Sequence, residues 1–299
     1  MTVQLIASCT DRKRAKVPDK LRLRSVRPGE NRSTKWLAEL ERNSAPPKPA
    51  RELYGGEHWQ LVLDLETQLQ EAGREVRLWV ASAGYGLVSA DTPLKPYSAT
   101  FSPREPDGVP AEEASAWWDA LCAGSSGEKT LQSLAERADT LVVIASAKYL
   151  RAMLPDLRRA RQPQPDPERL IVFSGSGLPE LDDSLVLVDD RIQVRLGGTK
   201  QGLAARTARH LLAEAQSWPP TATAMKQAYA RLVSGESRPE SPNRERHPDD
   251  DVEAFINKQL DENPRVGWTK LLRAWRDSGR ACEQKRFRGL YQDVKSKRE

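Results

Sequence analysis

The sequence has few of the residues that form disulfide frameworks or metal clips, and it has no long apolar run. Its 299 residues include three cysteines and three histidines, and Cys9, Cys122 and Cys282 are too widely spaced for a CxxC zinc motif. No apolar run reaches the roughly 20 residues that span a bilayer, and no basic segment leads into an apolar one near Met1. We therefore expect a cytoplasmic protein with reduced cysteines, no secretory signal, no membrane partner, no metal and no cofactor.

Positive charge is concentrated in two segments of a chain whose net charge is only +5. Residues 265–299 contain eleven Lys and Arg against four Asp and Glu, a net charge of +7, so the rest of the chain carries −2. Residues 11–32 contain nine basic and three acidic residues, a net charge of +6. Two basic segments predict a protein that contacts phosphates at two places. The alternative is that both segments are solvated surface.

Apolar runs alternate with amphipathic segments, which predicts an α/β fold with a mostly parallel sheet flanked by helices. The predicted strands are 3–7, 76–81, 140–145 and 170–174, with 185–188 and 192–196 as candidates to close the sheet. The predicted helices are 34–42, 58–72, 111–121, 130–138, 148–161 and 203–217.

Residues 234–251 are rich in Ser, Pro and charged residues and have no apolar periodicity, which predicts a linker. The linker separates an α/β domain, 1–233, from a small basic helical module, 252–299. A second Pro-rich stretch, 162–167, is expected to end the helix before it.

Four short polar motifs lie beside predicted strand ends or turns in the first hundred residues. They are 7–14 (ASCTDRKR), 53–59 (LYGGEHW), 81–87 (ASAGYGL) and 95–101 (KPYSATF). Small and polar residues at the carboxyl ends of parallel strands are the usual position of a ligand site in an open α/β sheet. The motifs therefore predict a polar pocket at this end of the sheet.

Cys9 follows the first predicted strand and precedes Arg12, Lys13 and Arg14. Neighbouring cations favour the thiolate, which is the nucleophilic form of cysteine. The alternative is a buried structural cysteine at a strand end, since cysteine is among the most buried residue types.

His58, at the start of a predicted helix, is a candidate general acid or base. A capping or surface role is the alternative. Gly84 and Gly86 allow a tight turn in which the backbone approaches a ligand. Tyr85 and Tyr97 are candidates to stack on a base, with core packing as the alternative.

The motifs LYGG, ASAGYGLV and DTPLKPYSATF resemble those of the YaaA-like superfamily, whose members carry a comparable stretch in which SGLYG-L is followed by D and PY. The resemblance covers about residues 1–215, and it is carried by Gly84, Tyr85, Gly86, Leu87, Asp91, Pro96 and Tyr97. It implies a compact α/β fold and association with nucleic acid.

The spacing Cys9-x3-Lys13 is similar to part of a motif of archaeosine synthases, which act on the nitrile of 7-cyano-7-deazaguanine in tRNA. In that family the motif continues with Pro-Tyr and is followed by Ser and His. This chain has Arg14-Ala15 in place of Pro-Tyr, and its first histidine after the motif is His58. Taken together, the two sets of motifs resemble those of DpdC-type proteins of bacterial 7-deazaguanine DNA-modification clusters. These proteins convert a nitrile on the base to an amide. The resemblances imply that a thiolate adds to the nitrile carbon, a neighbouring cation or acid protonates the nitrogen, and water hydrolyses the thioimidate.

The predicted site combines the motifs with these resemblances. Its candidate catalytic residues are Cys9, Asp11, Lys13 and His58. Its candidate substrate-binding residues are Ser8, Arg12, Tyr54, Ser82, Gly84, Tyr85, Gly86, Lys95 and Tyr97.

The C-terminal module is predicted to form three short helices, 250–260, 269–278 and 282–294, each with an apolar stripe. The break at 277–280, which contains Gly279, is compatible with helix-turn-helix geometry. A partner-binding or oligomerisation module is the alternative. The candidate nucleic-acid contacts are Arg14, Lys270, Arg273, Arg280, Lys285, Arg286 and Arg288.

The leading hypothesis is an enzyme that modifies a 7-deazaguanine base in double-stranded DNA, with Cys9 as nucleophile and the tail holding the DNA. The rival hypothesis is a non-catalytic DNA-binding or phage-defence protein whose pocket senses a nucleotide or base. Protein partners from a modification or defence cluster fit both. Labelling of Cys9 by iodoacetamide near neutral pH favours the enzyme, and an inert Cys9 favours the binder.

Overall fold

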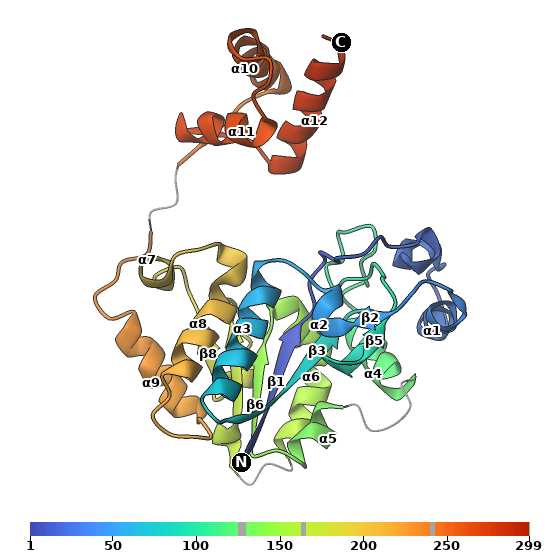
Figure 1. Ribbon diagram of the computed structural model, residues 1–299, viewed down its shortest axis with the longest axis vertical. Coiled ribbons are helices and arrows are strands. Elements are labelled where there is room, and N and C mark those ends of the chain that lie inside the picture. The colour runs from blue at the N-terminus through green and yellow to red at the C-terminus, as the bar shows by residue number, and fades with distance from the viewer. Residues whose placement is uncertain (125–129, 163–165, 240–242, 299) are drawn as a thin grey trace. The chain divides into compact units, whose positions relative to one another are not determined.

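The structure of the chain, a computed structural model, describes residues 1–124, 130–162, 166–239 and 243–298 (Figure 1). The chain divides into two compact units, Met1–Arg238 and Pro239–Glu299. No helix within the described ranges is both long and apolar enough to cross a membrane.

A six-stranded sheet forms the centre of the N-terminal unit, with the strand order β4-β3-β1-β6-β7-β8. All neighbouring strands are parallel except β3 and β4, which are antiparallel. The predicted α/β fold with a mostly parallel sheet is therefore confirmed. The strands are β1 (Thr2–Ser8), β3 (Glu75–Ser82), β4 (Gly86–Ser89), β6 (Thr140–Ile144), β7 (Leu170–Ser174) and β8 (Leu185–Leu187).

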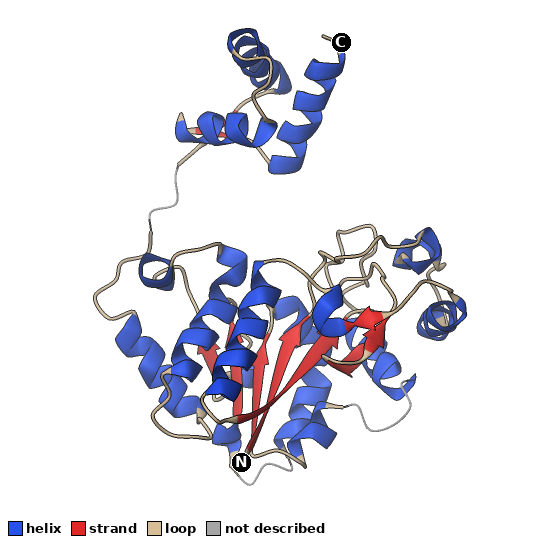
Figure 2. Cartoon of the chain, viewed as in Figure 1, coloured by secondary structure: helices blue, strands red, loops and turns tan. Residues whose placement is uncertain are grey.

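Helices cover both faces of this sheet (Figure 2). α3, α8 and α9 pack together on one face, and α4, α5 and α6 pack on the other. Every residue of β6 and β7 is buried, which explains why their sequences are continuous apolar runs rather than alternating ones. The helices are α3 (Glu57–Glu71), α4 (Ala114–Gly124), α5 (Leu131–Ala135), α6 (Ala147–Arg161), α8 (Leu203–Ala213) and α9 (Ala222–Leu232).

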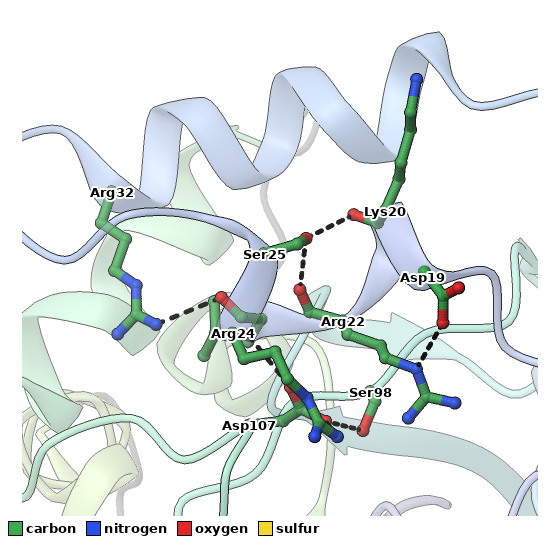
Figure 3. Close-up of polar contacts among 9 residues, drawn as sticks. Asp19, Lys20, Arg22, Arg24, Ser25, Arg32, Ser98 and Asp107 are labelled. Atoms are coloured by element: carbon green, nitrogen blue, oxygen red, sulfur yellow. Dashed lines mark hydrogen bonds and ion pairs between the residues drawn. The ribbon is translucent and has the colours of Figure 1, made fainter.

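A buried carboxylate holds the long segment between β1 and β3 in place (Figure 3). The Arg24 guanidinium donates to both oxygens of the Asp107 carboxylate, at 2.9 and 2.8 Å, and the Ser98 hydroxyl donates to it at 2.7 Å. Burial opposes ionisation of Asp107, but these hydrogen bonds outweigh it and lower its pKa. The same segment contains α1 (Arg32–Arg42), β2 (Lys48–Pro49) and α2 (Ala50–Leu53), and β2 pairs with β5 (Pro93–Leu94).

Several arginine side chains of the basic segment 11–32 make hydrogen bonds within the protein. Besides Arg24, the Arg22 guanidinium donates to Asp19 at 3.3 Å, and the buried Arg32 side chain donates to the carbonyl oxygens of Leu23 and Val26. Part of the positive charge that predicted phosphate contacts therefore stabilises the fold of this segment.

The predicted strand 192–196 is wrong, because this segment forms a short helix, α7 (Ile192–Leu196). Its apolar residues alternate, but Ile192 and Leu196 also stand four apart, and that spacing suits a helix. Only Ile192 is buried, and Gly197, at φ +64°, ends the helix. The helix α9 was not predicted; it packs on β7 and β8.

The C-terminal unit consists of three helices and a short pair of parallel strands. The helices are α10 (Asp249–Glu262), α11 (Trp268–Asp277) and α12 (Gln284–Ser296), and β9 (Glu245–Arg246) pairs with β10 (Arg280–Ala281). The apolar stripes meet in a core of their own, in which Ile256, Trp275 and Phe287 are fully buried.

The predicted linker, 234–251, contains regular structure as well as irregular chain. The division between the units falls between Arg238 and Pro239, and β9 and the first turn of α10 lie within the predicted range. Residues 240–242 of this range, and 163–165 of the Pro-rich stretch, lie outside the described residues.

Candidate active site

A cavity of about 540 Å³ lies at the carboxyl ends of β1, β6, β7 and β8. From β1 the chain crosses to β3 on one side, and from β6 it crosses to β7 on the other side. Connections that diverge between neighbouring parallel strands leave a crevice, which is the usual ligand site of an open α/β sheet. Ser8 and Cys9 line the cavity after β1, and Ala145 and Ser146 line it after β6. We call it the cysteine cavity.

Cys9 is the first residue after β1, and its side chain lies at the edge of the core, with the residue 6% exposed. Its main-chain N–H donates to the carbonyl of Ala81 at 2.9 Å, which extends the pairing of β1 with β3 by one residue. The chain then meets the LYGG motif, where the Gly55 N–H donates to the Arg12 carbonyl at 2.9 Å. The first two predicted motifs therefore lie side by side.

Two phenolic hydroxyls contact the thiol of Cys9. The Oη atoms of Tyr149 and Tyr97 lie 3.1 and 3.4 Å from its Sγ. The Tyr97 hydroxyl also lies 2.7 Å from Ser82 Oγ and 3.0 Å from the hydroxyl of Tyr54. One thiol and four hydroxyls thus form a continuous hydrogen-bonded network among buried residues.

The tyrosines of this network are proton donors at neutral pH. Burial raises the pKa of Tyr54, Tyr97 and Tyr149 well above the usual value, and negative charge on Cys9 raises these pKa values further. A hydroxyl that donates to the sulfur stabilises the thiolate, because a hydrogen bond to the charged form favours that form. At neutral pH these residues are therefore phenols that can donate hydrogen bonds to the sulfur of Cys9.

Lys13 brings a positive charge to the same network. Its Nζ lies 4.5 Å from the ring centroid of Tyr97 and 5.5 Å from that of Tyr54, within the range of a cation–π contact. Burial lowers the pKa of Lys13, and the negative charges of Cys9 and Asp11 oppose this effect. The ammonium is therefore a better acid than an exposed lysine.

His58 lies on the wall of the cysteine cavity, in the first turn of α3. Its Nε2 is 3.5 Å from the Ser8 hydroxyl, at the limit of a hydrogen bond. Burial lowers the pKa of His58 to about 4, so the imidazole is neutral at physiological pH and is a weaker base than an exposed histidine.

The turn after β3 packs against the tyrosines rather than against the cavity. Ser82 Oγ accepts hydrogen bonds from the main-chain N–H groups of Gly84 and Tyr85, at 3.2 and 3.0 Å. A Cβ on Gly84 would lie 2.4 Å from the ring of Tyr97, and one on Gly86, at φ +71°, would lie 3.0 Å from the main chain of Cys122. The close approaches that require glycine here are therefore to Tyr97 and to α4.

Four other predicted residues have different surroundings. Asp11 lines the cavity and is exposed, and the side chain of Arg12 is exposed. The Arg14 guanidinium donates to Gln60 at 3.4 Å on the surface. Lys95 donates to the carbonyl oxygens of Leu40 and Glu41, near the end of α1, so its ammonium is occupied there.

Sequence reasoning missed the residues that α6 and the later strands bring to the cavity. Tyr149 stands in the first turn of α6, five residues beyond the end of β6. The sequence could have indicated Tyr149, because it closely follows a buried parallel strand, as Cys9 does. Ser146, Ser174, Ser176 and Lys200 line the rest of the cavity, and Lys200 pairs with Asp190 at 2.6 Å.

The predicted nucleic-acid contacts of the tail fall into two groups. The guanidinium carbon of Arg280 lies 3.9 Å from the ring centroid of Trp275, and Arg286 pairs with Asp249 at 2.7 Å, so both stabilise the unit itself. Lys270, Arg273, Lys285 and Arg288 are exposed, and the guanidinium carbon of Arg288 lies 5.9 Å from the ring centroid of Trp268.

No group of three His, Cys, Asp or Glu side chains suited to a metal ion occurs in the described part of the chain. Comparison with protein-family models, with curated proteins and with solved structures found no match. The family resemblance therefore rests on the sequence motifs.

Proposed function

We propose that the chain is an enzyme that hydrates the nitrile of 7-cyano-7-deazaguanine in DNA to an amide, with Cys9 as nucleophile. The observation that carries the proposal is the position of the Cys9 thiol, on a cavity at the switch point of the sheet with two tyrosine hydroxyls on its sulfur. The cavity volume, about 540 Å³, is in the range typical of small-molecule sites. A base in a duplex reaches such a cavity by leaving the helical stack.

The residues of the network have distinct roles in this reaction. The Cys9 thiolate adds to the nitrile carbon, and the nitrogen takes a proton from Tyr149, which gives a thioimidate and a tyrosinate. Water then adds across the C=N bond, with neutral His58 positioned on the cavity wall to accept its proton. Collapse of this adduct breaks the C–S bond, releases the amide and restores the thiolate. His58 and Tyr149 return to their starting protonation states, so the balance is one nitrile and one water to one amide.

Lys13 assists the first step electrostatically. Its ammonium carries positive charge beside the tyrosine rings, and negative charge develops on Tyr149 and on the substrate nitrogen in that step. The proposal therefore gives Lys13 a stabilising role rather than a nucleophilic one.

The DNA is held, in this proposal, by the C-terminal unit acting as a helix-turn-helix-like module. α11 and α12 supply the two helices, and the turn between them contains Gly279 at φ +80°. The exposed cations Lys285 and Arg288 on α12 are the candidate phosphate contacts.

The experiment that tests the proposal is a mass measurement. Duplex DNA that contains 7-cyano-7-deazaguanine is incubated with the purified protein and digested to nucleosides. We expect the modified nucleoside to gain the mass of one water, and the Cys9→Ala protein to leave it unchanged. An unchanged nucleoside with the wild-type protein contradicts the proposal.

One observation favours the rival function, a non-catalytic sensor. Only 6% of Cys9 is exposed, and its sulfur already has two hydroxyl neighbours, as a structural cysteine has. A sensor binds the modified base without altering its mass, so the same experiment, combined with a binding measurement, separates the two functions.

A further inference from the structure

A second cavity, of about 420 Å³, lies within the C-terminal unit and is lined largely by arginine. We call it the arginine cavity. It is lined by Arg244 and Arg246 from the segment around β9, Arg276 from α11 and Arg286 from α12, together with Ala281, Cys282 and Glu283. Four arginines from three places in the sequence thus line one hollow.

Hydrogen bonds to main-chain carbonyl groups hold three of these arginines in position. The Arg244 Nε donates to the carbonyl of Arg276 at 3.0 Å, and the Arg276 Nη2 donates to the carbonyl of Cys282 at 2.9 Å. The Arg286 Nη2 donates to the carbonyl of His247 at 2.9 Å. A carbonyl fixes a guanidinium without neutralising its charge, and each guanidinium has five N–H groups in all.

The acidic groups near the cavity neutralise only part of this charge. Glu283 lines it and contributes one negative charge, and its carboxylate accepts hydrogen bonds from the main-chain N–H groups of Lys285 and Arg286, at 3.1 and 2.9 Å, as the N-cap of α12. Asp249 pairs with Arg286 at 2.7 Å. Among the described residues, the exposed Arg246 side chain has no ion-pair partner. The hollow therefore has an excess of positive charge.

We propose that the arginine cavity binds a phosphate group. Planar guanidinium groups match the oxygens of phosphate in pairs, and arginine is the usual residue where an anion with several oxygens is recognised from several sides. A terminal phosphate monoester offers three such oxygens and a larger charge than a carboxylate. This site needs neither catalysis at Cys9 nor a modified base, so it goes beyond the proposed function.

The first experiment uses inorganic phosphate and the full chain. Calorimetric titration with phosphate is compared with titration with chloride at the same ionic strength. We expect Arg246→Glu to weaken phosphate binding by about tenfold or more, because it replaces a charge-assisted donor by a repelling carboxylate. Its melting temperature should stay unchanged, since the Arg246 side chain is exposed.

Arg265→Glu is the matched control, because Arg265 is also an exposed arginine of the C-terminal unit but does not line the cavity. We expect it to change phosphate affinity by less than about twofold, since solvent and salt screen a distant charge. Equal losses in the two variants, or phosphate binding no stronger than chloride binding, would overturn the proposal.

A second experiment identifies the source of the phosphate. Anisotropy is measured with two labelled duplexes of one sequence, with a 5′-phosphate or a 5′-hydroxyl at the unlabelled end. A preference for the phosphorylated duplex that Arg246→Glu removes and Arg265→Glu keeps supports a nucleic-acid end as ligand. Equal binding of both duplexes, with inorganic phosphate still bound in the titration, supports a small phosphate compound instead.

Discussion

The cysteine cavity and the arginine cavity use polar groups in opposite ways. Around Cys9 the hydroxyls of Tyr54, Tyr97 and Tyr149 are buried and protonated, and their hydrogen-bond partners are one another, Ser82 and the Cys9 sulfur. The arginines of the second cavity are charged and are partly or fully exposed. A buried network responds strongly to the loss of one member, because the remaining polar groups then lack partners. A half-exposed cluster responds to charge and salt.

The largest effect that tests this comparison is expected from Cys9→Ala. If Cys9 is the nucleophile, turnover should fall by at least about a thousandfold, as it does when a covalent catalyst loses its nucleophile. The protein should still fold, but its melting temperature should fall, because the buried hydroxyl of Tyr149 loses the Cys9 sulfur as a hydrogen-bond partner. The measurement is nucleoside mass spectrometry beside a thermal melt.

Cys122→Ala is the control for this prediction. Cys122 is buried in α4 outside the cysteine cavity, and burial raises its pKa to about 12, so its thiol is inert at neutral pH. Activity should survive its removal. Wild-type turnover by the Cys9→Ala protein rules out the nucleophile assignment.

A smaller effect, on stability as well as activity, is expected from Gly84→Ala. The added Cβ would lie 2.4 Å from the ring of Tyr97, whose hydroxyl joins Ser82, Tyr54 and Cys9. We expect the free energy of unfolding to fall by about 1–3 kcal/mol, the usual cost of overpacking a core. Urea denaturation measures it.

Gly177→Ala is the matched control for Gly84→Ala, since a Cβ on the exposed Gly177 meets nothing within 4 Å. It should be close to neutral. If both variants are equally stable, the turn does not hold Tyr97 in place. The buried network is then less sensitive to overpacking than we expect.

The exposed cations of the tail should affect DNA binding without affecting stability. Replacing Lys285 and Arg288 by Ala should reduce the slope of log affinity against log salt by about one unit per lost phosphate contact. Arg280→Ala serves as control, because Arg280 stacks on Trp275 and Phe255 inside the unit. It should lower stability by about 0.5–1 kcal/mol and leave the slope unchanged.

Fluorescence anisotropy of a labelled duplex against salt measures these slopes. The same series includes Arg246→Glu, which alters an arginine that lines the arginine cavity. A slope that is the same in the wild type and in the Lys285/Arg288 variant contradicts DNA binding through α12 and favours a partner-binding role for its helices.

Local sequence patterns predicted five of the six strands of the sheet and a minority of the residues that line the cysteine cavity. Buried strands such as Thr140–Ile144 are continuous apolar runs that no other element explains, and Cys9 stands directly after such a strand. Tyr149 was missed because its role depends on β1 and β6 being neighbours, a pairing between residues far apart in the sequence. Strand order is a property of the whole fold, and no short segment encodes it.

The same limit applies to the charged segments. A run of basic residues looks the same in the sequence whether its side chains face solvent or bind acceptors within the protein. The sequence therefore did not show that Arg24 pairs with Asp107 or that Arg280 stacks on Trp275. The sequence of 192–196 fits both a strand and a helix, and in the structure it is a helix in which Ile192 is the buried residue.

The smallest effect expected is the contribution of His58 to the pH dependence of the free energy of unfolding. Burial lowers the pKa of His58 from 6.5 to about 4, so between these values the unfolded chain takes up a proton that the folded chain refuses. His58 therefore costs no stability above about pH 6.5, and stability falls as the pH drops from 6.5 to 4, by on the order of 1–3 kcal/mol. In His58→Gln this contribution is absent. Urea denaturation of both proteins from pH 7 to 4 should give free energies whose difference changes across this range, because all other groups titrate alike in the two chains. If the two curves stay parallel, His58 is solvated enough to keep its ordinary pKa, and the buried environment assigned to it in the cysteine cavity is wrong.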